Sequence, residues 1–362
     1  MKSSVYIHIP FCKSICSYCD FCKIYYNQKY IDNYLDCLEN EIKKFYQTNK
    51  IKTLYIGGGT PSSLSIKELS KLLNITKLFS MSKDLEFTIE LNIEHITKEM
   101  LELLYKNGVN RLSIGIQTFN EKHLHFLNRN HSKKEVTQKI EMAKKIGFDN
   151  INIDLIYAIP NQTKDELIED LNNLLELNVN HISTYSLIIE PHTKLYIDKT
   201  DYIDETLDFE MYQLINETLT KKGYNYYEIS NYGKSGYESK HNLVYWNNLE
   251  YYGFGMGASG YVDNVRYTNT TNINKYINGQ YHTEFELIDN KTKIENELIL
   301  GFRKTKGINK MDFLKKYNKS IYEINNIKKL IEEGKLVDDE TNIYISSKYL
   351  YLSNEILINF MV

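Results

Sequence analysis

The segment YIHIPFCKSICSYCDFC, residues 6–22, decides how the rest of this sequence is interpreted. It places three thiols on one short loop, with three residues and then two residues between them: Cys12, Cys16 and Cys19. Thiolates are soft ligands, so they select zinc or an iron–sulfur cluster over harder metals. A structural zinc site needs four ligands, and Cys22 or His8 is available as the fourth. A 4Fe-4S cluster uses the three thiols alone and leaves one iron open to bind a small molecule.

Length and composition indicate an ordinary globular protein rather than a nucleic-acid-binding, disulfide-rich or membrane-spanning one. Hydrophobic residues make up 42% of its 362 residues and charged residues 25%, which is typical of a soluble fold. The net charge is −3 without a basic stripe, which weighs against a nucleic-acid partner. Five cysteines, four of them in one loop, fit a reducing compartment rather than a disulfide framework. Without an apolar run of membrane-spanning length or a targeting peptide, we expect a cytoplasmic protein with no transmembrane segment.

Strand-like and helical segments alternate over the first two thirds of the chain. We expect strands at residues 5–9, 53–56, 86–91, 111–116, 150–157 and 181–187. We expect helices at residues 28–48, from 65 onward, and at 97–106, 120–127, 133–146, 164–177 and 204–222, where apolar residues recur at helical spacing. Such alternation predicts parallel strands joined by right-handed crossovers. The fold class is therefore α/β, a partial (β/α)6 barrel.

Polar residues gather at the ends of the expected strands, where barrel proteins build their sites. The cysteine loop follows the first strand and GGGTP, residues 57–61, follows the second. Glu90 ends the third strand, Gln117 the fourth, and Asp154 lies within the fifth. The glycine cluster lacks the Gly-Lys-Ser/Thr of a P-loop, so it is a weak signal by itself.

The character of the sequence changes after about residue 223. We expect a barrel domain at residues 1–225, a Gly- and Tyr-rich connecting region at 226–290, and a C-terminal domain at 291–362. In the C-terminal domain we expect helices, the last of them a charged helix at residues 328–337. Two strands should follow, NIYISS (342–347) and EILINF (355–360). That order is winged-helix-like, but no basic recognition helix accompanies it, which favours a packing or lid role.

The CxxxCxxC spacing, with Tyr18 before the third cysteine, resembles the radical S-adenosylmethionine (radical SAM) family. Residues 108–131, 152–163 and 181–193 resemble its coproporphyrinogen oxidase-like branch. YEISNY (227–232), HNLVYW (241–246) and GFGMGA (253–258) are similar to the heme chaperones of that branch. The resemblance covers almost the whole chain in order, and it favours the cluster over zinc.

The resemblance implies three sets of site residues. The cluster ligands would be Cys12, Cys16 and Cys19. The SAM contacts would be Tyr6, Tyr18, Gly59, Thr60, Glu90, Gln117, Arg129 and Asp154. A heme site would use His241, Asn242, Tyr245 and Trp246 of HNLVYW, with imidazole as a natural axial ligand. Without the resemblance, His241 reads as a hydrogen-bonded structural histidine.

The resemblance implies a heme chaperone that binds a 4Fe-4S cluster, SAM and one heme, and passes the heme to an acceptor protein, in solution or at a membrane. The rival is an oxygen-independent coproporphyrinogen III oxidase, a radical SAM enzyme that decarboxylates propionates. Those oxidases carry an extra cysteine two positions after the third ligand, where this chain has Phe21. A radical SAM enzyme with an unrelated substrate is the third possibility, and the role of Cys22 stays open.

The sequence departs from the family pattern at four positions. Ile93 replaces a proline, which should alter loop rigidity more than chemistry. Ala158 and Asn161 stand where the family usually has glycines, and Ser259 where a histidine is common. Backbone contacts to SAM near residue 160 are therefore less secure, and one heme ligand is absent.

Overall fold

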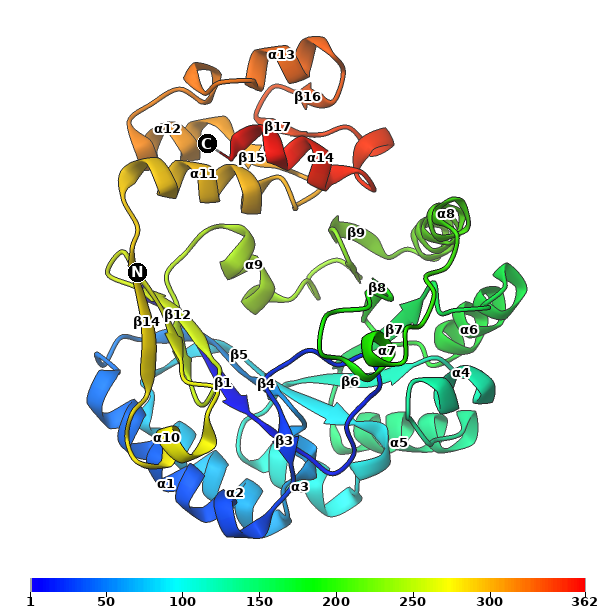
Figure 1. Ribbon diagram of the computed structural model, residues 1–362, viewed down its shortest axis with the longest axis vertical. Coiled ribbons are helices and arrows are strands. Elements are labelled where there is room, and N and C mark those ends of the chain that lie inside the picture. The colour runs from blue at the N-terminus through cyan, green and yellow to red at the C-terminus, as the bar shows by residue number, and fades with distance from the viewer. Residues whose placement is uncertain (1, 362) are drawn as a thin grey trace.

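The computed structural model describes residues 2–361 and is built on one nine-stranded sheet (Figure 1). The strands follow the order β11–β1–β4–β5–β6–β7–β8–β10–β9. Their bounds are β1 (Ser4–Ile9), β4 (Ile51–Gly58), β5 (Met81–Asn92), β6 (Arg111–Gln117), β7 (Asn150–Tyr157), β8 (His181–Ser186), β9 (Asn225–Glu228), β10 (Asn231–Gly233) and β11 (Tyr252–Phe254). The six strands β1, β4, β5, β6, β7 and β8 pair in parallel in this order, so the predicted six-stranded α/β core is confirmed.

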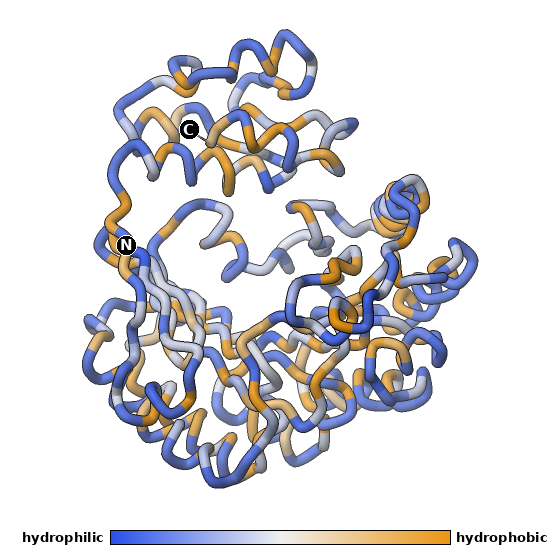
Figure 2. Tube along the Cα trace, in the orientation of Figure 1, coloured by the Kyte–Doolittle hydropathy of each residue, from blue (hydrophilic) through white to orange (hydrophobic). Residues whose placement is uncertain are grey.

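Helices connect these strands and present their polar faces outward (Figure 2). They are α1 (Gln28–Phe45), α2 (Ile66–Ile75), α3 (Lys98–Lys106), α4 (Glu121–Phe126), α5 (Lys133–Ile146), α6 (Lys164–Glu176), α7 (Lys194–Ile197) and α8 (Glu205–Lys221). Capping boxes start α2, with Ser65 and Glu68, and α6, with Thr163 and Glu166. Within residues 2–361, no helix combines the length and the apolar character that crossing a membrane requires.

The Gly- and Tyr-rich segment after α8 builds both edges of the sheet. Strand β11 pairs in parallel with β1, and β10 pairs antiparallel with β8, so the barrel stays open. The segment also forms α9 (Lys240–Trp246), α10 (Ile273–Ile277) and an antiparallel sheet of β12 (Ser259–Val262), β13 (Val265–Asn269) and β14 (His282–Leu287). A short pair, β2 (Phe11–Cys12) and β3 (Ile24–Tyr25), brackets the cysteine loop.

The C-terminal residues form a smaller body with its own apolar core, which includes Phe302, Phe313 and Ile343 (Figures 1 and 2). Its elements are α11 (Asn290–Gly301), β15 (Ile308–Asn309), α12 (Lys310–Tyr317), α13 (Ile327–Glu332), β16 (Leu336–Asp338), β17 (Asn342–Ile345) and α14 (Ser353–Leu357). The backbone N–H of Thr305 donates to the Tyr227 carbonyl oxygen at 3.1 Å, which ties this body to β9.

Two expectations for this body were wrong. The strand expected at residues 355–360 is α14 followed by a 3₁₀ turn, and it buries Ile356, Leu357 and Phe360. That i, i+1, i+4 spacing is helical, but a six-residue segment with four apolar residues does not distinguish helix from strand by itself. The helix expected at 328–337 ends near Gly334, whose φ is +69°, and the chain then enters β16.

A fully buried carboxyl on α1 holds the β11 edge in place. Glu41 Oε1 accepts a hydrogen bond from Asn269 Nδ2 at 2.6 Å. Its Oε2 accepts from the backbone N–H of Gly255 at 2.9 Å and from the Tyr276 hydroxyl at 2.5 Å. Burial raises the pKa of Glu41 to about 7, although these hydrogen bonds act in the opposite direction. The group therefore links α1 to three points of the segment that follows α9.

Replacing Glu41 by leucine should lower the free energy of unfolding by about 3 kcal/mol, because three buried donors lose their acceptor. Tyr276→Phe removes one donor and should cost about 1 kcal/mol. Urea unfolding measures both values. The control is Glu39→Gln on the same helix, where the Glu39–Lys43 pair is exposed and contributes little. A Glu41→Leu protein as stable as the wild type would show that the network does not stabilise this edge.

Candidate functional site

A cavity of about 450 Å³, here called the main cavity, lies at the carboxyl ends of the parallel strands. Most of the residues implied for cluster and SAM binding line it together: Cys12, Cys16, Tyr18, Cys19, Gly59, Thr60, Glu90, Gln117, Arg129 and Asp154. Tyr6 is not among the lining residues; its hydroxyl donates to His8 Nδ1 at 2.9 Å. Of the four residues implied for heme, only Asn242 lines the cavity.

The three loop cysteines carry free thiols on the wall of the main cavity. The Thr60 hydroxyl donates to Cys12 Sγ at 3.3 Å, and Arg129 Nη1 lies 3.7 Å from Cys16 Sγ. Burial raises the pKa of the Cys19 thiol to about 11. Among residues 2–361, no three His, Cys, Asp or Glu side chains converge as ligands of one metal ion.

Glu90, on β5, occupies space that the glycine cluster leaves open. A Cβ atom on Gly57 would lie 2.6 Å from the Glu90 carboxyl carbon. The Tyr55 hydroxyl donates to Glu90 Oε1 at 2.8 Å, and the Gly58 N–H donates to Oε2 at 2.9 Å. Gly58 has a φ of +113°, which side chains disfavour. Burial raises the pKa of Glu90 to about 7. The glycines therefore accommodate the half-buried Glu90 carboxyl, a role that the glycine cluster does not reveal in the sequence.

A second half-buried carboxyl, Asp154 on β7, faces the same cavity. Asn152 Nδ2 donates to Asp154 Oδ1 at 2.8 Å and lies 2.9 Å from the Ser113 hydroxyl. Burial raises the pKa of Asp154 above its usual range. The hydrogen-bond partners of both Glu90 and Asp154 are neutral groups. The cavity thus holds two carboxyls that a cationic ligand would stabilise in their charged form.

The interior of the sheet is polar along much of its length, not only at the strand ends. Apart from Leu91 and Ile156, the residues of β5, β6 and β7 that line the cavity are polar or glycine and stand at every second position: Glu90, Asn92, Arg111, Ser113, Gly115, Gln117, Asn152 and Asp154. The intervening residues are apolar and fully buried: Ile89, Leu112, Ile114, Ile116, Ile151 and Ile153. Parallel strands usually read as continuous apolar runs. This period of two was visible in the sequence, and the sequence analysis did not use it.

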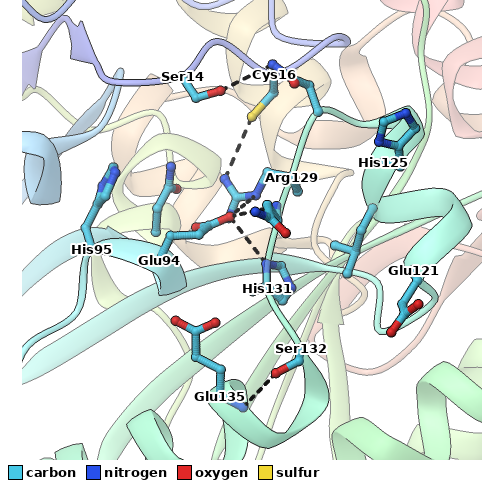
Figure 3. A pocket seen from close by; sticks show the side chains of 14 residues that line it. Ser14, Cys16, Glu94, His95, Glu121, His125, Arg129, His131, Ser132 and Glu135 are labelled. Atoms are coloured by element: carbon cyan, nitrogen blue, oxygen red, sulfur yellow. Dashed lines mark hydrogen bonds and ion pairs between the residues drawn. The ribbon is translucent and has the colours of Figure 1, made fainter.

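Arg129 lines the main cavity and also a second cavity of about 890 Å³, shown in Figure 3. Its Nη2 donates to the Gly115 carbonyl oxygen at 2.6 Å. Glu94 Oε1 lies 3.3 Å from Arg129 Nε and 3.3 Å from His131 Nδ1, and Figure 3 shows it pointing toward both. Burial alone would raise the pKa of Glu94, but His131 and Arg129 together lower it to about 2. Glu94, which the sequence analysis missed, therefore holds Arg129 in place.

Three residues near the cavity adopt left-handed backbone. Gln117 has a φ of +75°, Ala158 of +56° and Asn161 of +64°. Glycine takes such values without strain, so the backbone at positions 158 and 161 suits the glycines that the family resemblance implied there. The alanine here carries a strain of about 1 kcal/mol.

Comparisons with known proteins identify the family. The Radical SAM superfamily matches residues 6–174. The heme chaperone HemW of Lactococcus lactis is 39% identical over 99% of this chain and 97% of its own length. The heme chaperone HemW of Bacillus subtilis is 40% identical over 98% of each. The chain belongs to the HemW family. Each relative spans nearly the whole chain, so the family likeness includes the C-terminal body.

The fold that this HemW-family chain adopts is also known from experiment. The solved coproporphyrinogen III oxidase HemN of Escherichia coli, a radical SAM enzyme, superimposes with a TM-score of 0.87. The match covers 99% of this chain and 90% of that one, at 24% sequence identity. The radical SAM fold expected from the cysteine loop is therefore confirmed, including its smaller C-terminal part.

The HNLVYW motif of this HemW-family chain packs inward through its histidine. The ring of His241 on α9 is buried, and Thr53 Oγ1 lies 2.8 Å from its Nδ1. The Tyr245 hydroxyl lies 2.8 Å from its Nε2. Burial lowers the pKa of His241 to about 3. Arg303 of the C-terminal body lies over the Trp246 ring at 5.8 Å. In this arrangement His241 has no nitrogen free for iron, and the motif joins α9 to β4 and to the C-terminal body.

Two further polar groups of the loop are committed to packing. His8 Nε2 donates to the Cys22 carbonyl oxygen at 2.7 Å, while its Nδ1 accepts from Tyr6. Cys22 lies against Gly257 of GFGMGA, where a Cβ atom would approach its Sγ to 2.6 Å and φ is +78°. Burial raises the pKa of the Cys22 thiol to about 11. Both residues therefore connect the cysteine loop to the chain around it.

Glu94→Gln should lower the free energy of unfolding by about 2 kcal/mol at pH 7, because Arg129 loses its carboxylate. The folded pKa of Glu94, about 2, lies below the ordinary 4.5, so its contribution is complete above pH 4.5. That contribution disappears as the pH falls toward 2, so the difference between the two proteins should narrow at pH 3. Urea unfolding of both proteins at pH 7 and at pH 3 measures the difference in the free energy of unfolding.

The matched control is Glu121→Gln, which lines the same second cavity and should change stability by less than about 0.5 kcal/mol. An equal loss for Glu94→Gln at pH 7 and pH 3 would contradict the electrostatic role of Glu94.

Proposed function

We propose that this HemW-family protein is a heme chaperone built on a radical SAM scaffold. It binds a 4Fe-4S cluster, SAM and one heme, and it passes the heme to an acceptor protein. The observation that carries the proposal is the main cavity, where three free thiols, Arg111 and two half-buried carboxyls, Glu90 and Asp154, line the same wall. Neither carboxyl forms an ion pair within residues 2–361, and their hydrogen-bond partners are neutral groups. Relatives of nearly equal length are named as heme chaperones, which supports the same function here.

Cys12, Cys16 and Cys19 would hold the cluster. When bound, such a cluster supplies an open iron for the methionine end of SAM and, once reduced, the electron that cleaves SAM. Burial raises the pKa of the Cys12 thiol, and the hydrogen bond that the Thr60 hydroxyl donates to its Sγ acts in the opposite direction. The Arg129 guanidinium donates toward Cys16 Sγ. The fit therefore rests on the residues around the thiols as well as on the thiols themselves.

The remaining wall suits a cationic nucleoside that carries an amino acid. Glu90 and Asp154 offer negative charge to the SAM cation and acceptors to its hydroxyls. The N–H groups of Gly59 and Thr60 already donate to Ile9 and Phe11. Because these N–H groups are already used, the backbone at Gly59 and Thr60 would contact the ammonium group of SAM through its carbonyl oxygens. Arg129 provides a planar set of donors for a carboxylate, held by Glu94. Gln117 and Tyr18 complete this wall, and Tyr6 supports it through His8.

The rival function is oxygen-independent coproporphyrinogen III oxidation, which the shared fold with HemN permits. Fold alone does not decide activity, so the choice depends on the site. Phe21 occupies the position of the additional cysteine of those oxidases, which favours the chaperone. A radical SAM enzyme with an unrelated substrate would bind the cluster and SAM without a stoichiometric heme.

Cys16→Ala should abolish the visible absorption of the reconstituted cluster, since two remaining thiolates do not hold it. Cys37→Ala is the control, because the Cys37 thiol lies on α1 and donates to the Ile277 carbonyl oxygen away from the cavity. Absorbance and iron content per chain measure both variants after anaerobic reconstitution. An unchanged spectrum for Cys16→Ala would remove the ligand assignment.

The function itself is tested by titrating the reconstituted protein with heme and following the Soret absorbance. Saturation near one heme per chain is expected, together with transfer to apo-acceptor proteins. In parallel, the protein should not convert coproporphyrinogen to protoporphyrinogen. Conversion without stoichiometric heme binding would establish the oxidase instead, and the absence of both would favour an unrelated substrate.

A further inference from the structure

The main cavity has an apolar rim that the cluster and SAM do not explain. Three large side chains line the cavity and are also exposed: Phe21 at 64%, Tyr185 at 42% and Ile188 at 62%. Phe21 belongs to the cysteine loop, whereas Tyr185 and Ile188 come from the end of β8 and the chain after it. These three residues are called the rim below. The rim contrasts with the polar interior of the sheet.

The rim belongs to a wider gathering of exposed apolar side chains. Of the 18 large hydrophobic residues exposed on residues 2–361, seven lie within residues 21–25 and 185–202. The cysteine loop that precedes residues 21–25 contacts the second of these segments, because the Leu195 N–H donates to the Ser17 carbonyl oxygen at 3.1 Å. A group of exposed large apolar side chains that lines one cavity marks a binding surface, whereas single exposed apolar residues elsewhere are ordinary. Only the three rim residues among these seven line the cavity.

The charges at the rim suit a ligand with an apolar body and anionic ends. Lys23 lines the cavity beside Phe21, and its Nζ donates to the Cys19 and Phe21 carbonyl oxygens at 2.5 and 3.2 Å. It forms no ion pair with a carboxylate in the part of the chain that the structure describes. Asp20 and Glu190 also line the cavity, so a dianionic ligand has one favourable orientation, with its carboxylates toward Lys23.

We infer that the heme binds at the rim, with its ring against Phe21, Tyr185 and Ile188 and its propionates toward Lys23, above the SAM site in the same cavity. The inference rests on the proposed function and gives its ligand a location. The buried, doubly hydrogen-bonded ring of His241 lies elsewhere and contributes to the α9 packing. Heme at the rim covers the cavity, so the rim must be exposed for loading and release.

Heme titration of reconstituted rim variants tests this location. Ile188→Asp and Phe21→Ser should each weaken heme binding about tenfold or more, since each removes a large apolar contact. The matched controls are Ile197→Asp and Tyr25→Ser, at side chains that are 69% and 67% exposed but do not line the cavity. The controls should bind heme as the wild type does. SAM binding and iron content show whether each variant is folded and loaded.

Ile188→Asp decides the test if Phe21→Ser fails to take up its cluster, because Ile188 is far from the cysteine loop in sequence. Wild-type affinity in a loaded Ile188→Asp protein would overturn the inference. Loss of heme in His241→Phe, with the rim variants unaffected, would overturn it as well and place heme at HNLVYW. A wild-type protein that binds no heme at all would instead remove the proposed function.

Discussion

The structure depends on the burial of polar side chains along one face of a parallel sheet. Buried polar groups need partners, and each strand supplies them to its neighbours, as Asn152 does for Ser113 and Tyr55 does for Glu90. The opposite face is apolar and is covered by helices, so the two faces cannot exchange without a register shift of one residue. The polar face can therefore only point into the open barrel, and that requirement creates the main cavity.

The charges in this cavity are arranged by what surrounds them. Glu90 and Asp154 have neutral partners, which leaves room for a positive ligand, whereas Arg129 already has Glu94 beside it. Gly57 and Gly58 contribute by having no side chains, because the Glu90 carboxyl takes that space. The lining of the main cavity is polar near the sheet and apolar at the rim. One cavity thus offers a polar and an apolar environment.

Fold and family answer different questions about this chain. The fold is shared with a coproporphyrinogen III oxidase, whereas chains of nearly equal length and about 40% identity are heme chaperones. In the structure, the histidine and the tryptophan of HNLVYW connect α9 to β4 and to the C-terminal body. These contacts account for both side chains by packing within this chain.

The order of residues was sufficient for the six parallel strands, the cysteine loop and most of the polar side chains at the strand ends, because these depend on local periodicity and on the rule that parallel strands end together. It was not sufficient for the pairing of β11 with β1, the role of Glu41, the Glu94–Arg129 contact or the burial of His241. These features join residues far apart in the chain, for example Glu41 and Tyr276, and no local pattern encodes such a contact. The short helix at residues 353–357 was missed because six apolar-rich residues fit either period until the neighbouring core selects one.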